Sequence, residues 1–482
     1  MNQAVKIGVA VLTKLILILA LLCASQLEAQ RKSTSVNVNR NGKTTISIKN
    51  GFGNNFSVEY QGDITLTDDD SDIAAISRGG YIEIKRSAFG NRRRIFMEPD
   101  NSGRLIKRYY VGGSQRNFDT EGKKWLAEIL LEVVRSTTLG SEERVNRMYK
   151  KGGYYPVLKE VDQITSNYVK SRYLKLLLEK NLDEKGLVAV LKRVGDIDSD
   201  HHKASILKYN TKSFLSTAAT TTGYIRAASK IDSDHHTATV LIPALNEATI
   251  SATQMNALLE IVSDIDSDHH KASVLIRSLE NRSLQPESVK LLLTTAATIN
   301  SDHHTASVLK RALSSTELSS SGAQTVLATI ENMDSDHHIA SVLITMLDTP
   351  LQKEALARLL EEVDREMSSD IHRATVLSKV IQRQNVKQAL DTFLGTLTAL
   401  DSDHHKAEVF RQLARENFDT EQLIAIVEAT TSINSDHHQS AALLSFASAV
   451  SNAGKLARDA YVDATSTISS DAHLGRTLRA IR

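Results

Sequence analysis

The sequence is almost free of cysteine. Of its 482 residues only Cys23 is a cysteine, and it lies near the N-terminus. A single cysteine leaves no partner for an internal disulfide, and removal of the leader described below would leave no thiol at all. Disulfide-stabilised folds and thiol chemistry are therefore excluded for the mature chain.

An excess of charge of one sign is also missing. There are 58 Lys and Arg against 57 Asp and Glu, which gives a formal net charge of +1. Proteins that bind nucleic acid usually carry a concentrated basic surface, so we expect no nucleic-acid partner. The share of apolar residues, 41%, and of charged residues, 24%, is typical of a soluble globular protein.

The common catalytic motifs are absent as well. The chain has no His-Glu-x-x-His, no Gly-x-Ser-x-Gly and no glycine-rich phosphate loop. Its histidines all stand at equivalent places in a repeat, so none is singled out as a general base. We therefore expect a protein that is not an enzyme, with no catalytic residues and no cofactor.

Residues 1–29 have the composition of a Sec-type signal peptide. Lys6 precedes an apolar run over Ile7–Leu22, and small residues follow it. Cleavage before Gln30 would place the protein in the periplasm or outside the cell, with no membrane span in the mature chain. Lipid attachment at Cys23 and an uncleaved anchor remain as alternatives.

Residues 30–118 show the alternating pattern of β-strands and predict a small antiparallel β domain. The expected strands are Val36–Val38, Thr45–Ile48, Phe56–Tyr60, Ile64–Leu66, Tyr81–Ile84 and Arg104–Val111, and the expected turns are Asn41-Gly42, Gly79-Gly80 and Asn101–Gly103. The densest positive charge is at Arg92–Arg94. This triplet has two interpretations: a site for an anionic surface or polysaccharide, or a solvated edge strand protected by charge.

Residues 119–153 return to a helical pattern and predict a junction that also caps the repeats. Trp125–Val134 is amphipathic, a second helix begins at Ser141, and Gly152-Gly153 suits its end. We expect Trp125, the only tryptophan, to pack in the core.

The rest of the chain is organised around a tandem signature, Ser-Asp-His-His-x-Ala-x-Val-Leu. Copies recur every 33 to 35 residues. The residue after the motif serine is Asn167, Asp200, Asp234, Asp268, Asp302, Asp336, Asp370, Asp403, Asp436 or Asp471. A period in the thirties is typical of stacked helix-turn-helix units, so residues 154–482 predict an α-solenoid of about nine to ten helix pairs.

Each unit predicts two helices. In the copy at 267–275, Ser267 suits a helix N-cap and Asp268 complements the helix dipole. Ala272, Val274, Leu275 and Leu279 then form one apolar face of this second helix.

The first helix of each unit is the variable segment before the motif. Glu287–Ile299 and Gln352–Val363 are examples. Ser251 and Gln254 match a capping box, and Thr349-Pro350 predicts proline at the first helical position.

The half-motif resembles the start of the second helix in tetratricopeptide repeats, although the Trp, Leu-Gly and Tyr positions of their first helix are absent here. More of the chain resembles uncharacterised secreted bacterial proteins in which Ser-Asp-Tyr-Glu-Lys-Ala-x-Val-Leu repeats follow a small β-rich region. That resemblance implies a helical solenoid and carries no known activity.

All 16 histidines belong to the signature. The first histidine position holds His201, His235, His269, His303, His337, His404 and His437; the second holds His202, His236, His270, His304, His338, His372, His405, His438 and His473. The nine second-position residues are the candidate metal ligands, since imidazole suits zinc, copper and nickel. Successive helical residues point about 100° apart, however, so Asp268, His269 and His270 are not expected to converge on one ion.

A structural interpretation of the histidines competes with the metal one. The second histidine occupies the third helical position, where its imidazole can accept the backbone N–H of the N-cap residue and close a capping box. The first looks like a tolerant surface position, because Ile371 and Ala472 replace it. The sequence therefore predicts a non-catalytic secreted scaffold with a protein or peptide partner on the solenoid surface, and a metal-binding or metal-sensing protein as the alternative.

Overall fold

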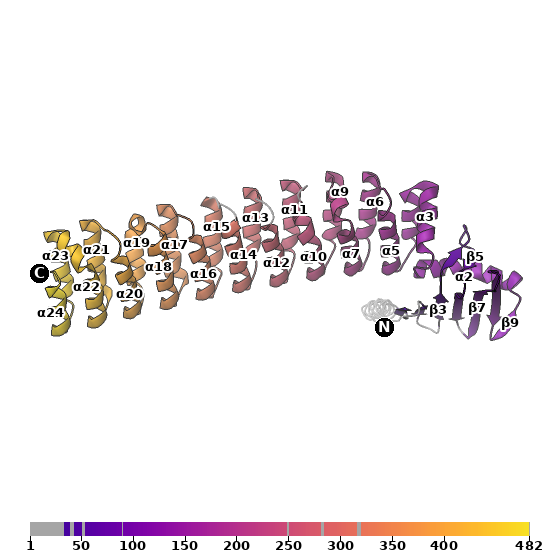
Figure 1. Cartoon of the computed structure of the whole chain (residues 1–482), viewed down its shortest axis with the longest axis horizontal. Coiled ribbons are helices and arrows are strands. Elements are labelled where there is room, and N and C mark those ends of the chain that lie inside the picture. The colour runs from indigo at the N-terminus through magenta and orange to yellow at the C-terminus, as the bar shows by residue number, and fades with distance from the viewer. Residues whose placement is uncertain are drawn as a thin grey trace, which may run out of the picture. The chain divides into compact units, whose positions relative to one another are not determined.

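The computed structural model describes residues 33–38, 43–50, 54–88, 90–247, 250–280, 284–315 and 320–481. The expected signal peptide at 1–29, Cys23 and the turn at Asn41-Gly42 lie outside these residues. The predicted fold class is confirmed, because a small antiparallel β region is followed by a long series of helical repeats (Figure 1).

The chain forms two compact units. Unit 1 ends at Asn210 and contains the β region together with the first helices. Unit 2 begins at Thr211, and its described residues form helices and the loops between them, without a strand.

A seven-stranded antiparallel sheet is the main feature of the described part of unit 1, in the order β1-β2-β3-β6-β7-β8-β9, with a separate β4-β5 hairpin. The strands are β1 Ser33–Val38, β2 Thr44–Asn50, β3 Asn54–Gln61, β4 Ile64–Leu66, β5 Ile73–Ile76, β6 Tyr81–Ala88, β7 Asn91–Pro99, β8 Leu105–Val111 and β9 Ser114–Arg116. Three of them, β5, β7 and β9, were not among the expected strands. The turns at Gly79 and Gly103 are confirmed, and both glycines have positive φ.

One face of the sheet is apolar and is covered by helix α2, Lys123–Ser136, which follows a short π-helix at Phe118–Gly122. Ile84 and Ile95 on the sheet share a core cluster with Ile129 and Val133 of α2. Trp125 is 5% exposed and its ring lies 5.7 Å from that of Tyr109 on β8. The prediction that Trp125 packs in the core is therefore confirmed.

The remaining helices of unit 1 are α3 Ser141–Gly152, α4 Tyr154–Val161, α5 Asn167–Leu178, α6 Glu184–Gly195 and α7 Asp200–Tyr209. A buried ionic network joins them to the β4-β5 turn. Arg144 is 1% exposed and contacts Asp70 at 2.9 Å, Glu160 at 3.0 Å and the hydroxyl of Tyr173. Burial opposes the charge of Glu160, but hydrogen bonds from Arg135 and Arg144 outweigh it and lower the pKa of that carboxyl. A buried arginine with this many partners needs no further ligand.

Unit 2 consists of stacked helix pairs. Its helices are α8 Thr211–Phe214, α9 Ala218–Ala228, α10 Asp234–Leu245, α11 Ala252–Ser263, α12 Asp268–Ser278, α13 Pro286–Ala296, α14 Asp302–Ser315, α15 Ser320–Ile330, α16 Asp336–Met346, α17 Lys353–Glu366, α18 Asp370–Arg383, α19 Leu390–Thr398, α20 Asp403–Leu413, α21 Thr420–Ala429, α22 Asp436–Asn452, α23 Lys455–Thr465 and α24 Asp471–Arg479, with 3-10 turns at Val386–Ala389 and Thr430–Ser432. The first helices of the pairs, such as α11 and α13, form one row, and the second helices, such as α12 and α14, form the other (Figure 1).

The expected caps are confirmed in one case and wrong in another. Ser251 and Gln254 form the predicted capping box at the start of α11. Pro350 is not in a helix, because α17 begins at Lys353 with Gln352 as its N-cap. The predicted end of α3 is confirmed by Gly153, whose φ of 68° suits a residue without a side chain.

The predicted apolar face of the second helix is buried. Ala272 is 2% exposed, Val274 and Leu275 are 0% exposed, and Leu279 is 3% exposed. The small side chain of Ala272 leaves no open space for a longer one in a close-packed interior.

We therefore expect Ala272→Leu to lower the free energy of unfolding by about 1 to 3 kcal/mol through overpacking. His269→Ala, which removes an exposed side chain, should change it by less than about 0.5 kcal/mol. Thermal melts of the two variants provide the measurement. Equal shifts in Tm would contradict the assignment of the two faces.

Candidate functional site

The aspartate that begins each second helix bonds to the next repeat. The carboxylate of Asp234 accepts hydrogen bonds from the backbone N–H groups of Asp266, at 3.3 Å, and Ser267, at 2.7 Å. The same pair of bonds recurs at Asp268, Asp302, Asp336, Asp370, Asp403 and Asp436. We call this series the aspartate ladder.

The aspartate ladder adds to one prediction and corrects another. Asp268 does stand in the first turn of its own helix, but its oxygens are hydrogen-bonded to residues 32 and 33 positions further on. The backbone N–H of Ser267 is bonded to Asp234, so the capping box predicted for His270 is wrong. Ser267 does occupy the N-cap, where its hydroxyl accepts the N–H of His270 at a long 3.4 Å. The aspartate in nine of the ten copies was the available signal for a contact between repeats.

A second connection between repeats comes from the residue after the two histidines. Lys271 is 6% exposed, and its ammonium group donates to the hydroxyl of Thr298 at 3.1 Å. Lys406 is 5% exposed and donates to the carbonyl oxygen of Ser432 at 2.8 Å. Both acceptors lie just after the next repeat's first helix, and the one at Ser432 is a carbonyl group of the kind that lacks a helical partner at a helix end. This position holds Lys, Thr, Ile, Arg, Gln or Leu in different copies of the signature, so nothing in the sequence indicated its role.

The histidines form a zigzag of ring contacts. The ring of His269 lies 5.2 Å from that of His270 in its own repeat and 5.6 Å from that of His304 in the next, both measured between centroids. The two rings of each contact are steeply inclined, at about 64°. This edge-to-face arrangement is the favourable one for aromatic rings. A first-position histidine therefore touches second-position histidines of two repeats.

We call this zigzag the histidine row, and in unit 2 it has two segments. One runs from His236 to His372 and the other from His405 to His473. The break falls where Ile371 replaces the first histidine. In unit 1, His202 contacts His201 and also Tyr168, which stands at the first position of the preceding copy.

All nine candidate ligands at the second position are half-buried, whereas the first-position histidines are exposed. The candidates are His202, His236, His270, His304, His338, His372, His405, His438 and His473. The ring contact between repeats joins the first histidine position of one repeat to the second position of the next. The repeat pattern aligns equivalent positions, so this diagonal contact could not be predicted from it. Among the described residues, no group of three or more His, Cys, Asp or Glu side chains is placed to hold a metal ion.

The row disfavours protonation at several of its half-buried rings. Burial lowers the pKa of His304, and the neighbouring imidazoles His303 and His269 lower it further, while Asp268 opposes the change. The pKa values of His338 and His438 are lowered in the same way, and burial followed by His201 lowers that of His202. A charged imidazole is penalised here because it loses water and meets a second cation.

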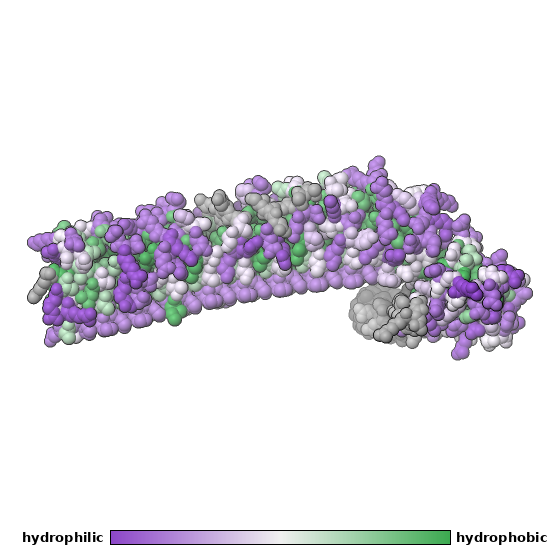
Figure 2. Space-filling view, in the orientation of Figure 1, coloured by the Kyte–Doolittle hydropathy of each residue, from purple (hydrophilic) through white to green (hydrophobic). Residues whose placement is uncertain are grey.

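A band of hydrophilic residues follows one long edge of unit 2 (Figure 2). The second helices of the pairs lie along this edge in Figure 1. Within the described residues, no helix is long and apolar enough to cross a membrane.

No protein-family model matches the chain, and no curated protein matches it.

The aspartate ladder yields a stability prediction. Asp302→Ala removes a charged acceptor from the N–H groups of Asp334 and Ser335, so we expect a loss of about 1 to 3 kcal/mol in the free energy of unfolding. Asp334→Ala is the matched control, because this exposed side chain lies in the same loop. Denaturant titration of both variants measures the difference, and an equal loss would show that the ladder adds nothing to stability.

The histidine pKa values predict a loss of stability on mild acidification. Since the folded pKa values of His304, His338 and His438 are lowered, the unfolded chain binds more protons. The contribution of these neutral histidines to the free energy of unfolding is complete above the unfolded pKa of about 6.5. It is lost as the pH falls through that value toward the lower pKa values of the folded state. Tm should fall between pH 8 and pH 5, and less so when these three residues are changed to Gln. A level or rising Tm in the native chain would contradict this.

Proposed function

We propose that unit 2 is a non-catalytic scaffold that presents its histidine row to a protein or peptide partner. The observation that supports this is the regular exposure of one kind of side chain at the same place in successive repeats. The aspartate ladder holds the repeats in register, so the row is preorganised. A partner that binds a preordered surface loses less conformational entropy in the protein.

The spacing of the row favours an extended partner. Packed helices lie about 8 to 10 Å apart, so equivalent positions recur at about this distance. An extended chain rises about 3.3 Å per residue, so every third residue of a bound peptide would meet the next repeat. A neutral imidazole both donates and accepts a hydrogen bond, which suits the polar groups of such a chain.

We also propose that this binding takes place in the periplasm or outside the cell. The support is the signal-like composition of residues 1–29.

Affinity capture from the native envelope fraction, followed by crosslinking and mass spectrometry, tests the scaffold. We expect crosslinks to the second helices and loss of capture in the triple variant His269→Ser, His303→Ser and His337→Ser. Ser substitutions at Glu260, Lys290 and Lys353 are the control, since these residues are exposed on the first helices. Equal capture by both variants would overturn the assignment of the row.

Metal binding is the second candidate, and the ring contacts favour it. Neighbouring imidazoles lie 5.1 to 5.8 Å apart between centroids across the two segments of the row. An imidazole binds a metal through a nitrogen lone pair in the plane of its ring. Two rings at this separation could share one ion once one of them rotates out of the edge-to-face arrangement, and water would complete the coordination. Calorimetric titration with zinc distinguishes the candidates. Binding tighter than about micromolar, with one ion per histidine pair and loss in the triple variant, would replace the scaffold proposal.

A further inference from the structure

The Arg92–Arg94 triplet of unit 1 is not on an edge strand. Strand β7 pairs with β6 on one side and with β8 on the other, and Arg93 and Arg94 have partners in both ladders. The edge-strand interpretation of this triplet is therefore wrong, because an interior strand has no free edge to protect. The positive charge needs another explanation.

The strand register gathers polar side chains on the face opposite helix α2. Ser57, Lys85, Arg94 and Tyr110 are direct cross-strand neighbours and form one row over four strands. A second row consists of Asn55, Ser87 and Arg92. Adjacent strands lie about 4.8 Å apart, so the longer row spans about 14 Å.

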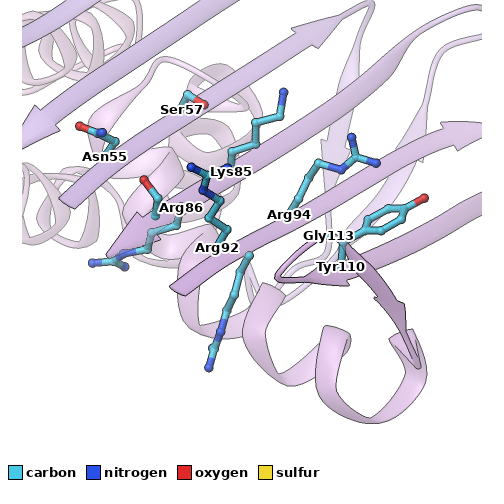
Figure 3. Close-up of a pocket in the computed structure, with 10 residues that line it drawn as sticks. Asn55, Ser57, Lys85, Arg86, Arg92, Arg94, Tyr110 and Gly113 are labelled. Atoms are coloured by element: carbon cyan, nitrogen blue, oxygen red, sulfur yellow. The ribbon is translucent and has the colours of Figure 1, made fainter. Parts of the chain in front are cut away.

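Side chains alternate along each strand, so Arg86 and Arg93 belong to the other face of the sheet. Figure 3 shows Lys85, Arg92 and Arg94 on one side of the strands, with Arg86 turned the other way. These residues line a hollow of about 550 Å³. Among its described lining residues none is acidic and none is aliphatic.

The cations of the hollow outnumber their carboxylate partners. Lys85 and Arg94 share Glu83, and Arg94 lies 3.3 Å from it. Arg86 contacts Glu132 at 2.9 Å. In the described part of the chain, Arg92 and Arg93 make no ion pair.

Two of the cross-strand pairs join like charges. Lys85 is opposite Arg94, and Arg86 is opposite Arg93. Like charges directly opposite each other destabilise a sheet. An unfavourable local arrangement on an otherwise regular sheet is typical of a functional surface, where a bound ligand supplies the missing opposite charge.

We propose that this face of the sheet binds an anionic oligosaccharide, with Lys85, Arg92 and Arg94 contacting its sulfate, phosphate or carboxylate groups. Guanidinium groups suit these anions because their donors match two oxygens at once. Asn55, Ser57 and Ser87 supply neutral donors and acceptors for sugar hydroxyls.

The composition of the lining favours a sugar over other polyanions. An acyl chain would need aliphatic side chains to pack against, and the described lining residues include none. Single-stranded nucleic acid binds by stacking its bases on aromatic rings, and the tyrosine at this hollow already holds a guanidinium. That contact places Arg94 4.2 Å from the ring centroid of Tyr110.

Binding of the purified chain to size-matched dextran, sulfated dextran and polygalacturonate oligosaccharides tests the proposal by titration calorimetry. A single-stranded oligonucleotide and vesicles of anionic phospholipid are the competing probes. We expect binding of a sulfated or carboxylated oligosaccharide but not of dextran, weakened at least about tenfold in Arg92→Gln/Arg94→Gln. The control Lys123→Gln/Lys124→Gln removes the same charge from exposed positions of helix α2 and should bind as the native chain does.

Thermal melts verify that the test variant folds. Arg94→Gln removes one member of a like-charge pair but also the contacts of Arg94 with Glu83 and Tyr110, so the Tm should stay close to that of the native chain. If that variant melts lower, Arg92→Gln alone replaces it, because this residue makes no ion pair in the described structure. If the control variant bound the anionic oligosaccharide equally weakly, only net charge would matter, and the assignment of the binding site to this face would be overturned. Tighter binding of the oligonucleotide or the vesicles, or no binding of any anionic sugar, would overturn the choice of ligand.

Discussion

Each repeat of unit 2 is held to the next by one carboxylate, and most of the architecture depends on it. The N–H groups before a helix have no helical partners, and burying them without acceptors is costly. Asp336 supplies an acceptor to Ser369 at 2.6 Å, and each preceding or following aspartate does so for its own neighbour. Because the acceptor comes from the adjacent repeat, the bond provides a partner for the unpaired N–H groups at the start of a helix. The same bond sets the register of the stacked repeats. A solenoid is built from such neighbour-to-neighbour contacts.

The histidine row follows from this register but is not needed for it. Ile371 interrupts the row, and yet Asp336 still bonds to Ser369 and Asp370 still bonds to Ser402 across the interruption. The stack therefore continues without a first-position imidazole. Ring contacts between an exposed and a half-buried side chain contribute little stability compared with charged hydrogen bonds. A role in binding thus explains the repeated histidines better than a role in folding, which is why the scaffold proposal is based on the row.

The sequence was sufficient for the architecture because the period and the apolar face are local patterns. Ala272 and Leu275 lie on one helix face wherever the helix packs, so their burial could be predicted. The hydrogen-bond partner of Asp268 could not be predicted. It is Ser301, which lies 33 residues further on and is brought near only by the stacking of repeats. The same is true of His269 and His304, whose contact is diagonal rather than between equivalent positions. Strand β7 was missed because its three arginines interrupt the alternation that identifies strands.

The two proposed surfaces differ in how their charge arises. The guanidinium groups on the sheet of unit 1 stay protonated at all physiological pH values, so their attraction for anions is permanent. In unit 2 the lowered pKa values of His304, His338 and His438 keep these imidazoles neutral until the pH falls, and charging them then costs stability. One surface is thus suited to retaining an anionic ligand throughout, and the other to a partner whose binding changes with pH. Because each surface lies in its own compact unit, the two properties can vary independently.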